Sequence, residues 1–371
     1  MGLQLRSQSR LASVNNHFWV GYLGQANYKI KEGFEVSAGL DARYYRGSHY
    51  QEVKDLLGGD YYIDLSDKNA ASPMKRVGDK ISKNLFNANR DGLVTWIGAF
   101  GQVEYESKKI NAFINLSSIQ NGYCGIDYFQ KRRLYINDTI LEFGYGDTLQ
   151  YQGNTYHSQS DGVDYATTGW KFIPGFTFKS GISFKLGKYS NLFTNVGFLN
   201  RTPMYSNVID NNYNKFFAEI ANENILAIEQ GFSYTAKDFG INVNTYATRW
   251  KNKPFPYGVP IPDPNDPSEN IYVNINGMDA IHMGGEIDIA WNIVKKLSTE
   301  IMFSVGDWYW NSSKTVVIPQ FDSLAYTFDA KGVHVGDAAQ TALSATVRYE
   351  PIKNLYVKGQ VQYFDRYYSD F

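Results

Sequence analysis

The chain has 371 residues, 16% of them aromatic, together with 33 Gly and a formal net charge of -1. This balance of charge argues against nucleic acid as a partner, and the single cysteine, Cys124, excludes an internal disulfide and a cysteine-rich metal site. No segment approaches 18 consecutive apolar residues, so helical membrane spans are excluded, whereas spans made of strands are not.

Six pairs of long extended segments follow one another along the chain, and each pair is joined by a short turn that contains a lysine. We predict paired strands at residues 15–28 and 34–46, 93–106 and 110–119, 170–186 and 192–200, 224–236 and 241–253, 278–293 and 298–310, and 341–349 and 355–368. Soluble strands usually end after about five or six residues, whereas a strand that crosses a bilayer at a tilt needs ~9–11. The lengths therefore favour strands that cross a membrane.

Apolar and polar side chains alternate along these segments. Between Ile241 and Thr248, Ile, Val, Thr and Ala occupy every second position, and Asn, Asn, Tyr and Thr occupy the positions between. Successive side chains of a strand point to opposite faces, so the strand has one apolar and one polar face. Such a strand suits a barrel wall with lipid on one side and water or a plug on the other.

The connections between the predicted strands alternate strictly between short turns and long polar segments. The long ones are predicted at 47–90, 120–168, 201–222, 254–267 and 311–336; the first includes a dense acidic stretch, and the fourth is rich in proline. Tight turns on the periplasmic side and long loops outside are typical of outer-membrane barrels. The sequence predicts an all-β fold, an antiparallel transmembrane β-barrel wall of about 12 strands. A soluble β-rich carbohydrate-binding module stays open as a different class.

Several stretches resemble the barrel domain of TonB-dependent outer-membrane receptors. They are Ile228–Tyr234, Asn242–Tyr246 with Arg249-Trp250-Lys251, Gly284–Ile289, Val335–Gln340 leading into Val347–Pro351, and Phe198–Pro203. The resemblance implies a barrel of about 22 strands, of which this chain would supply about half. We therefore expect residues 1–371 to be an outer-membrane β-barrel domain fragment, internal to the barrel, without signal peptide, plug domain or C-terminal strands.

The resemblance also implies a function. It implies active uptake of a scarce nutrient, such as a siderophore, cobalamin or a glycan, at the cell outer membrane. The implied partners are outer-membrane lipid, the plug domain of the same full-length protein, the TonB complex acting through the missing N-terminal part, and a small-molecule or oligomeric nutrient. No cofactor is implied. The alternative is a passive porin or a surface adhesin barrel, and an upstream plug would separate these.

Two sets of residues are candidates for ligand or plug contact. Aromatic residues gather at the loop ends of the predicted strands: Tyr44, Tyr45, Trp250, Trp308, Tyr309 and Trp310. They fit an interfacial girdle, or a surface on which a ligand ring stacks. Polar residues at alternate strand positions are expected to face the lumen and to contact the plug: Asp41, Arg43, Glu104, Asn242, Asn244, Glu286 and Asp288, with Asn111, Asn115, Lys358 and Gln360.

Catalytic and metal chemistry find little support. The five histidines include His49, His157 and His334 in or beside predicted loops, no serine lies at a recognisable motif with them, and Gly-x-Ser-x-Gly is absent from the sequence, so we expect no enzyme. Carboxylates could hold a hard cation in three places: Asp60, Asp64 and Asp67; Asp263, Asp266 and Glu269; or Asp329 and Asp337 with His334. Scattered acids in loops are usually only solvated, so no metal is predicted.

Overall fold

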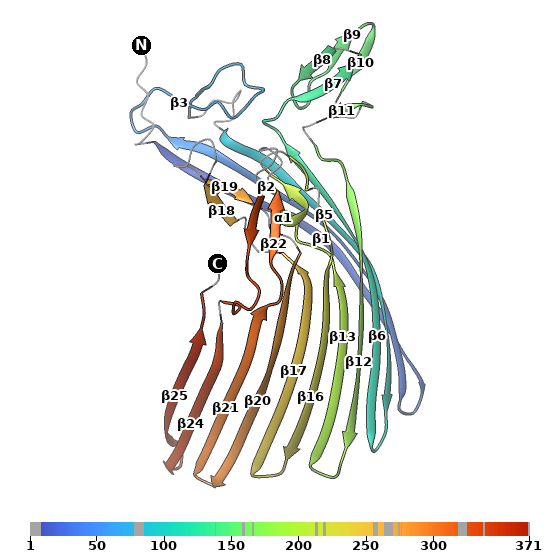
Figure 1. Cartoon of the computed structure of the whole chain (residues 1–371), viewed down its shortest axis with the longest axis vertical. Helices are drawn as coiled ribbons and strands as arrows, with labels where there is room; N and C mark the ends of the chain where they lie inside the picture. The colour runs from blue at the N-terminus through green and yellow to red at the C-terminus, as the bar shows by residue number, and fades with distance from the viewer. Residues whose placement is uncertain are drawn as a thin grey trace.

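One curved antiparallel sheet dominates the molecule (Figure 1). The computed structural model describes residues 9–77, 85–137, 139–157, 160–164, 167–211, 214–217, 220–254, 259–262, 270–273, 275, 277–317, 325–336 and 338–369. Within these residues the sheet has 12 strands in the order β1-β2-β5-β6-β12-β13-β16-β17-β20-β21-β24-β25, so each strand pairs with the next strand of the wall along the chain. The predicted all-β fold with about 12 antiparallel strands is confirmed.

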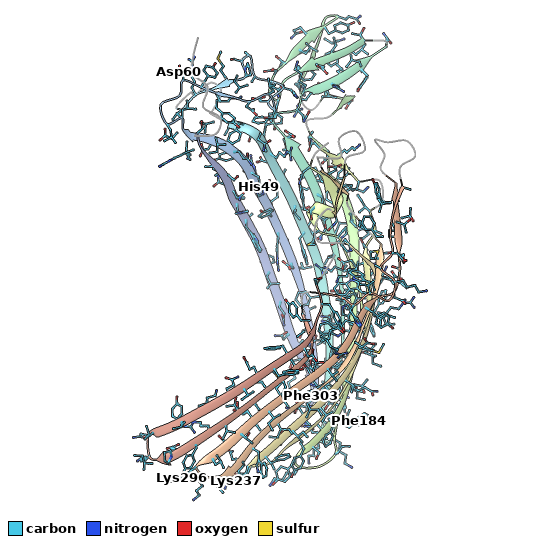
Figure 2. The ribbon with its side chains drawn as sticks, turned by 60° about the vertical axis from the view of Figure 1, so that its left-hand side comes forward. His49, Asp60, Phe184, Lys237, Lys296 and Phe303 are labelled. Atoms are coloured by element: carbon cyan, nitrogen blue, oxygen red, sulfur yellow. The ribbon has the colours of Figure 1, made fainter. Side chains whose placement is uncertain are left out.

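The wall consists of the six predicted hairpins. They are β1 (Arg10–Lys31) with β2 (Phe34–Asp55), β5 (Leu85–Glu106) with β6 (Ile110–Asp127), β12 (Lys171–Lys185) with β13 (Ser190–Arg201), β16 (Glu223–Thr235) with β17 (Phe239–Lys253), β20 (Met278–Val294) with β21 (Leu297–Trp310), and β24 (Ala339–Ile352) with β25 (Leu355–Tyr367). Their short turns lie at one end of the sheet and the long connections at the other (Figure 1). In Figure 2, Lys237 and Lys296 mark the turn end, and Asp60 marks the loop end. In the first turn Gly33 has a φ of 74°, a conformation that glycine adopts without strain.

The first four strands of the wall are longer than predicted. β1, β2 and β5 have 22 residues each and β6 has 18, whereas the other eight have 12 to 17. The prediction of loops over 47–90 and 120–168 is therefore wrong at their edges, and His49 lies within β2. The sequence hides these extensions because the alternation stops there: polar residues occupy both faces at the end of β2, and residues 120–127 of β6 mix glycine with polar and apolar residues.

The long connections carry small elements of their own. These are β3 (Tyr62–Ile63) with β4 (Met74–Lys75), β7 (Arg132–Ile136) with β8 (Thr139–Phe143) and β11 (Val163–Asp164), β9 (Leu149–Tyr151) with β10 (Asn154–Tyr156), α1 (Tyr205–Val208) followed by β14 (Ile209–Asp210) and β15 (Lys215–Phe216), β18 (Val259–Pro262) with β19 (Asn270–Val273), and β22 (Lys314–Val317) with β23 (Ala325–Phe328). Among the described helices, none has the length and hydropathy to cross a membrane.

The register gives the sheet two chemically different faces. Large apolar side chains stand exposed on the face that carries Phe303, which we call the apolar face; Ile97, Leu116 and Val361 share it and are 57% to 68% exposed. The opposite face, which carries Asp288, is the polar face. A water-soluble monomer rarely exposes an apolar surface that continues over so many strands. The apolar face therefore needs a cover other than water.

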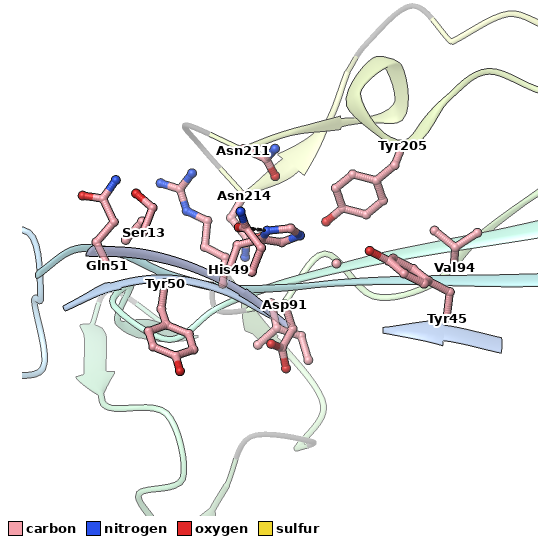
Figure 3. Close-up of a pocket in the computed structure, with 15 residues that line it drawn as sticks. Ser13, Tyr45, His49, Tyr50, Gln51, Asp91, Val94, Tyr205, Asn211 and Asn214 are labelled. Carbon is pink, nitrogen blue, oxygen red and sulfur yellow. Dashed lines mark hydrogen bonds between the residues drawn. The ribbon is translucent and has the colours of Figure 1, made fainter. Parts of the chain in front are cut away.

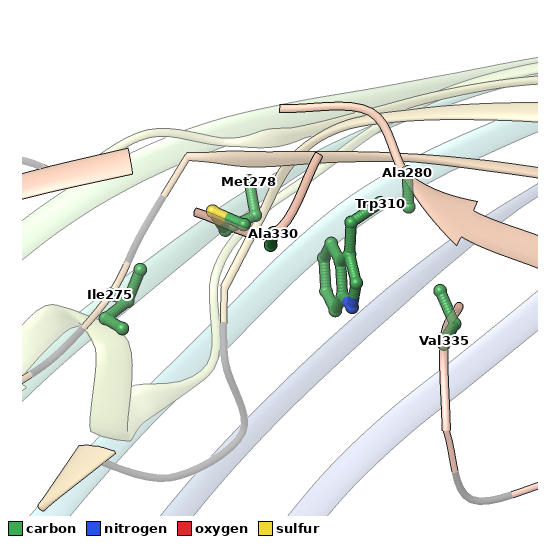
Figure 4. Close-up of a cluster of buried hydrophobic side chains, with 6 residues drawn as sticks. All are labelled: Ile275, Met278, Ala280, Trp310, Ala330 and Val335. Atoms are coloured by element: carbon green, nitrogen blue, oxygen red, sulfur yellow. The ribbon is translucent and has the colours of Figure 1, made fainter. Parts of the chain in front are cut away.

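Loop segments fold back over the polar face at the loop end of the wall. Trp310 from β21 is 2% exposed and packs in a buried cluster with Ile275, Met278, Ala280, Ala330 and Val335 (Figure 4). The backbone N–H of Trp310 donates to the carbonyl of Val333 at 2.9 Å, which fastens the segment after β23 to the wall. A second cluster joins Tyr123 and Ile173 of the wall to Val208 and Ile209 of the loop that contains α1. The core of the molecule thus lies between the wall and its loops.

Candidate functional site

All of the residues predicted to face a lumen lie on the polar face. The register pairs Asn242 with Asp288 and Asn244 with Glu286 across β17 and β20, and it places Asp41, Arg43 and Glu104 on the same face of β2 and β5. Asn111, Asn115, Lys358 and Gln360 share it too. Their common face follows from the period of two along a strand. That this face lines a lumen or contacts a plug stays a prediction.

Arg43 on the polar face contacts one carboxylate and two indole rings. Its guanidinium donates two hydrogen bonds to the carboxylate of Asp41, from Nε at 2.9 Å and from Nη2 at 2.7 Å. The guanidinium carbon also lies 5.9 Å from the ring centroid of Trp19 and 5.4 Å from that of Trp96. Because cations favour the faces of indole rings, these contacts fix the side chain in place. Sequence reasoning missed Trp19 and Trp96, although they occupy polar-face positions opposite Tyr45 and Arg43.

The six candidate aromatic residues divide between the two faces. Tyr45, Trp250, Trp308 and Trp310 lie on the polar face, whereas Tyr44 and Tyr309 lie on the apolar face. The structure does not bring the six together, since the tyrosines at 44 and 45 belong to β2 and the others belong to β17 and β21. The position of Tyr44 and Tyr309 suits an interfacial girdle, and the other four face the side on which the loops fold back.

Two of the six aromatic residues, Trp250 and Trp308, flank His282 in a row across β17, β20 and β21. The imidazole of His282 lies 6.1 Å from the ring of Trp250 and 5.8 Å from the ring of Trp308. Trp250 donates from Nε1 to Glu223 at 2.8 Å, and Trp308 donates to the hydroxyl of Tyr246 at 2.9 Å. Because each indole N–H is already bonded, this row offers ring faces rather than free donors.

A cavity of about 430 Å³ lies at the loop end of the first hairpin (Figure 3). Its floor is the extended part of β1, β2 and β5, which includes Tyr45 and His49, and its roof is the loop that contains α1. The side chains that line it from the polar face of the sheet are Ser13, Asn15, Tyr45, His49, Gln51, Arg90 and Val94, and those from the roof are Tyr205, Asn211 and Asn214. Its volume lies in the range of small-molecule sites. The cavity is the candidate functional site.

Hydrogen bonds attach the roof of the cavity to the wall. Tyr123 donates from its hydroxyl to the carbonyl of Pro203 at 2.7 Å, and Asn121 donates to Thr202 Oγ1 at 2.6 Å, so the segment before α1 is fastened to β6. The ring of Tyr205 then lies over two glycines of the wall. A Cβ at Gly92 would come within 3.1 Å of that ring, and one at Gly125 within 2.9 Å of its hydroxyl. Glycine at both positions lets the roof approach the wall.

Side-chain hydrogen bonds between β1 and β2 organise the floor of the cavity. On the polar face, His17 Nδ1 and the hydroxyl of Tyr45 are 2.6 Å apart, and His49 Nδ1 lies 2.7 Å from Asn15 Oδ1. The two histidine rings are 5.8 Å apart. These contacts link β1 to β2 and hold the two rings beside the cavity.

The two charged groups at the cavity wall are already paired. Asp91 points to the opposite side of the sheet (Figure 3), where it accepts from Arg46 Nε at 2.8 Å and from the hydroxyl of Tyr128 at 2.6 Å. Arg90 donates to the buried carboxylate of Asp127 at 3.2 Å. Burial raises the pKa of the Tyr205 phenol, and burial together with the Asp91 carboxylate raises the pKa of Tyr128. Both phenols are therefore neutral at physiological pH.

A second cavity, of about 720 Å³, lies on the wall near the turn end. Glu104, Glu106, Asn111, Phe113, Phe193 and Asn195 are among its lining residues, and Gln102 donates to Glu104 beside it. Glu35 on β2 pairs with Glu104 in the register, so two carboxylates lie side by side. Adjacent like charges favour cations nearby, and Lys29 of β1, which pairs with Glu35 on its other side, is one such cation at this end of the polar face.

The metal and catalytic alternatives gain nothing from the geometry. In the 60–67 stretch Asp67 lies 3.5 Å from the fully buried ammonium of Lys75, so a cation of the protein already occupies that place. His334 stacks on Tyr368 with ring centroids 4.2 Å apart. The described residues hold no group of three or more His, Cys, Asp or Glu side chains placed for a metal. Asp337 and the set Asp263, Asp266 and Glu269 lie outside the described residues.

Comparison with known proteins identifies the fold. No protein-family model and no curated protein sequence matches the chain. Solved structures do match: the copper transporter OprC with a TM-score of 0.62 at 12% identity, over 95% of this chain and 44% of that one; the siderophore receptor PiuA from Acinetobacter baumannii with 0.58 at 13%, over 97% and 47%; and the ferric citrate transporter FecA with 0.53 at 10%, over 92% and 41%.

The chain therefore spans less than half the length of these structures. Its wall has the barrel fold of TonB-dependent outer-membrane receptors, which confirms the expected resemblance at the level of fold. The neighbours are named as transporters and receptors rather than enzymes.

Proposed function

We propose that this chain is part of the barrel wall of a TonB-dependent receptor that imports a scarce nutrient across the cell outer membrane. The observation that carries the proposal is the apolar face, which stays exposed from β1 to β25 although the backbone of the wall is paired strand to strand. Lipid can cover an apolar surface, but it cannot bond to backbone groups, so a paired sheet with one apolar face suits a bilayer.

The polar face would then line the lumen. Its charged residues include Asp41, Arg43, Glu104, Glu286 and Asp288, which sit among amides and aromatic rings. Charges next to a packed domain need partners, so we assign these residues to contact with the plug domain of the full-length protein. The acidic pair of Glu35 and Glu104 would accept basic side chains of that plug.

No covalent step is involved in the proposed activity. Loops at one end of the wall would capture the nutrient, since binding residues concentrate on loops that a rigid scaffold holds. Energy would come from the TonB complex acting on the plug, as in the family that the sequence resembles. A passive porin would have the same wall without that dependence.

The test uses intact cells that express the full-length protein. An epitope inserted between Gly146 and Asp147, in the exposed loop after β8, should be reached by antibody from outside, and the protein should co-purify with the outer-membrane fraction. A strain without the protein is screened for the nutrient that it no longer acquires, and uptake of that nutrient is measured with and without TonB. Uptake that persists without TonB would favour the porin, and a soluble protein would contradict both.

A further inference from the structure

The cavity between the first hairpin and the α1 loop has the features of a dedicated ligand site. It is enclosed by two parts of the chain that lie more than 100 residues apart, and Tyr45 on the floor and Tyr205 on the roof both border it. Gly92 and Gly125 leave room for the roof because a side chain at either position would meet Tyr205. Nothing in the six-hairpin wall itself requires this arrangement.

The cavity lies beyond the expected level of the hydrocarbon. A strand of 22 residues is ~70 Å long at about 3.3 Å per residue, whereas ~9–11 residues cross the bilayer. Gln51 and His49 lie near the end of β2 that is remote from the short turn. In the proposed orientation the cavity therefore opens on the side from which a nutrient arrives.

The lining has little net charge to offer a ligand. Asp91 lies on the other side of the sheet with Arg46 and Tyr128, and Arg90 is committed to Asp127, whose side chain is 3% exposed. The Asp127 carboxylate accepts from Arg90 through Nε and balances the charge of the guanidinium. The described lining residues therefore carry no unbalanced charge for a multiply charged chelate.

Neutral groups make up the rest of the lining. Gln51 carries an amide NH2 that can donate, while its Oε1 accepts from Asn87 Nδ2 at 3.1 Å. Asn211 carries both a donor and an acceptor, and the hydroxyls of Ser13 and Tyr205 can serve as either. The Tyr45 and Tyr205 rings add apolar faces. Amides and hydroxyls that donate and accept match a ligand whose hydroxyl groups do the same, and aromatic faces match the C–H side of a sugar ring.

We propose that this cavity binds a neutral, hydroxyl-rich ligand, a saccharide, as the first contact of the imported nutrient. The inference rests on the proposed function for its biological meaning, but binding itself needs neither TonB nor a membrane potential. A binding experiment on purified protein can therefore fail while import stands, and import can fail while binding stands.

The full-length protein in detergent is applied to an array of neutral oligosaccharides of hexoses and pentoses, and its affinity for a ferric tris-catecholate chelate is measured in parallel. We expect retention of at least one neutral oligosaccharide. Tyr45→Ala and Gln51→Glu should each weaken the binding of that oligosaccharide by about tenfold or more. The first removes an aromatic ring, and the second adds a negative charge on a side chain of nearly the same shape. Tyr44→Ala changes the neighbouring residue on the apolar face and should leave binding unchanged.

Two results would overturn the inference. One is that the array retains no neutral oligosaccharide, or retains it equally well with Tyr45→Ala and Gln51→Glu. The other is that the ferric chelate binds and that its affinity, rather than a sugar's, falls in these variants. The chosen substitutions lie on the floor of the cavity and leave the roof unchanged. To show that a loss of binding is not a loss of folding, the thermal unfolding of each variant is compared with that of Tyr44→Ala.

Discussion

The indole Nε1 of Trp308 on β21 donates to the hydroxyl of Tyr246 on β17 at 2.9 Å, reaching across the whole width of β20. The contact is possible because β20 presents Gly284 at that point: a Cβ there would lie 2.5 Å from the Tyr246 hydroxyl. Each ring thus lies over a glycine, since Gly306 is in the same relation to Trp308. Two aromatic side chains are held flat on the polar face.

Gly284→Val should therefore destabilise the wall. The added side chain pushes Tyr246 away, breaks its bond with Trp308 and also meets the backbone carbonyl of Val305, which lies 2.5 Å from the Cβ position. We expect a loss of about 1–3 kcal/mol, as for overpacking of a filled site. Urea unfolding in lipid vesicles measures it. Gly197→Val on β13 is the matched control, because Gly197 also lies on the polar face and a Cβ there comes no nearer than 3.6 Å to another atom. Equal stability of the two variants would show that Tyr246 does not lie as described.

The pair of Arg90 and Asp127 beside the cavity gives a second prediction. Arg90→Leu strands a carboxylate that is 3% exposed, and breaking such a pair costs about 3 kcal/mol when one partner is partly exposed. Adding Asp127→Asn to Arg90→Leu should restore much of the loss, since an uncharged amide needs no counter-charge. The same unfolding assay checks both. Asp127 Oδ1 also accepts from the backbone N–H of Phe129 at 2.9 Å, a bond that the side-chain oxygen of asparagine keeps. A double variant that is less stable than Arg90→Leu would contradict the pairing of Arg90 with Asp127.

The raised pKa of the Tyr128 phenol leads us to expect a loss of stability at high pH. Burial and the hydrogen bond to Asp91 raise its pKa above the ordinary value of 10.0 in the folded chain. A raised pKa means that stability is complete below pH 10 and declines as pH rises, because the unfolded phenol ionises first and the folded one stays protonated. The free energy of unfolding is measured at fixed salt between about pH 9 and 11, on either side of the ordinary tyrosine pKa. It should fall less steeply with rising pH in Tyr128→Phe than in the unchanged protein. An identical decline in both would contradict the assignment.

The two faces of β21 should tolerate charge differently. Phe303 lies on the apolar face and its neighbour Ser304 lies on the polar face. If lipid covers the apolar face, Phe303→Arg costs about 2–4 kcal/mol near the middle of the bilayer, whereas Ser304→Arg costs little. The ratio of folded to unfolded protein in vesicles of phosphatidylcholine reports both. Equal costs would indicate that both faces meet the same surroundings.

Local pattern was enough to predict the wall. The turns and the alternation between Ile241 and Thr248 follow from neighbours a few residues apart, and a period of two then assigns alternate residues of a strand to one face. Asp41 and Asp288 could be placed on one face in this way, although about 250 residues separate them. The full length of β2 was missed because its last third is polar on both faces.

The candidate site could not be predicted from the same pattern. Its roof depends on Tyr205 meeting Gly92 and Gly125, and no local rule relates residues so far apart in the chain. Trp310 was predicted as a girdle or ligand residue, yet loop residues bury it, because the loop after β23 folds back on the wall. Which way a loop folds depends on such packing rather than on the periodicity of the strands.

The measurement that tests the central claim most directly is site-directed spin labelling along β21. Cys124 is first changed to Ser, and single cysteines are then placed at 301, 302, 303, 304 and 305 of the full-length protein in vesicles. We predict that labels at 301, 303 and 305 collide with oxygen dissolved in lipid, and that labels at 302 and 304 respond instead to a water-soluble nickel complex or are shielded by packed protein. Labels that respond to the nickel complex alike at all five positions would contradict a wall between lipid and lumen.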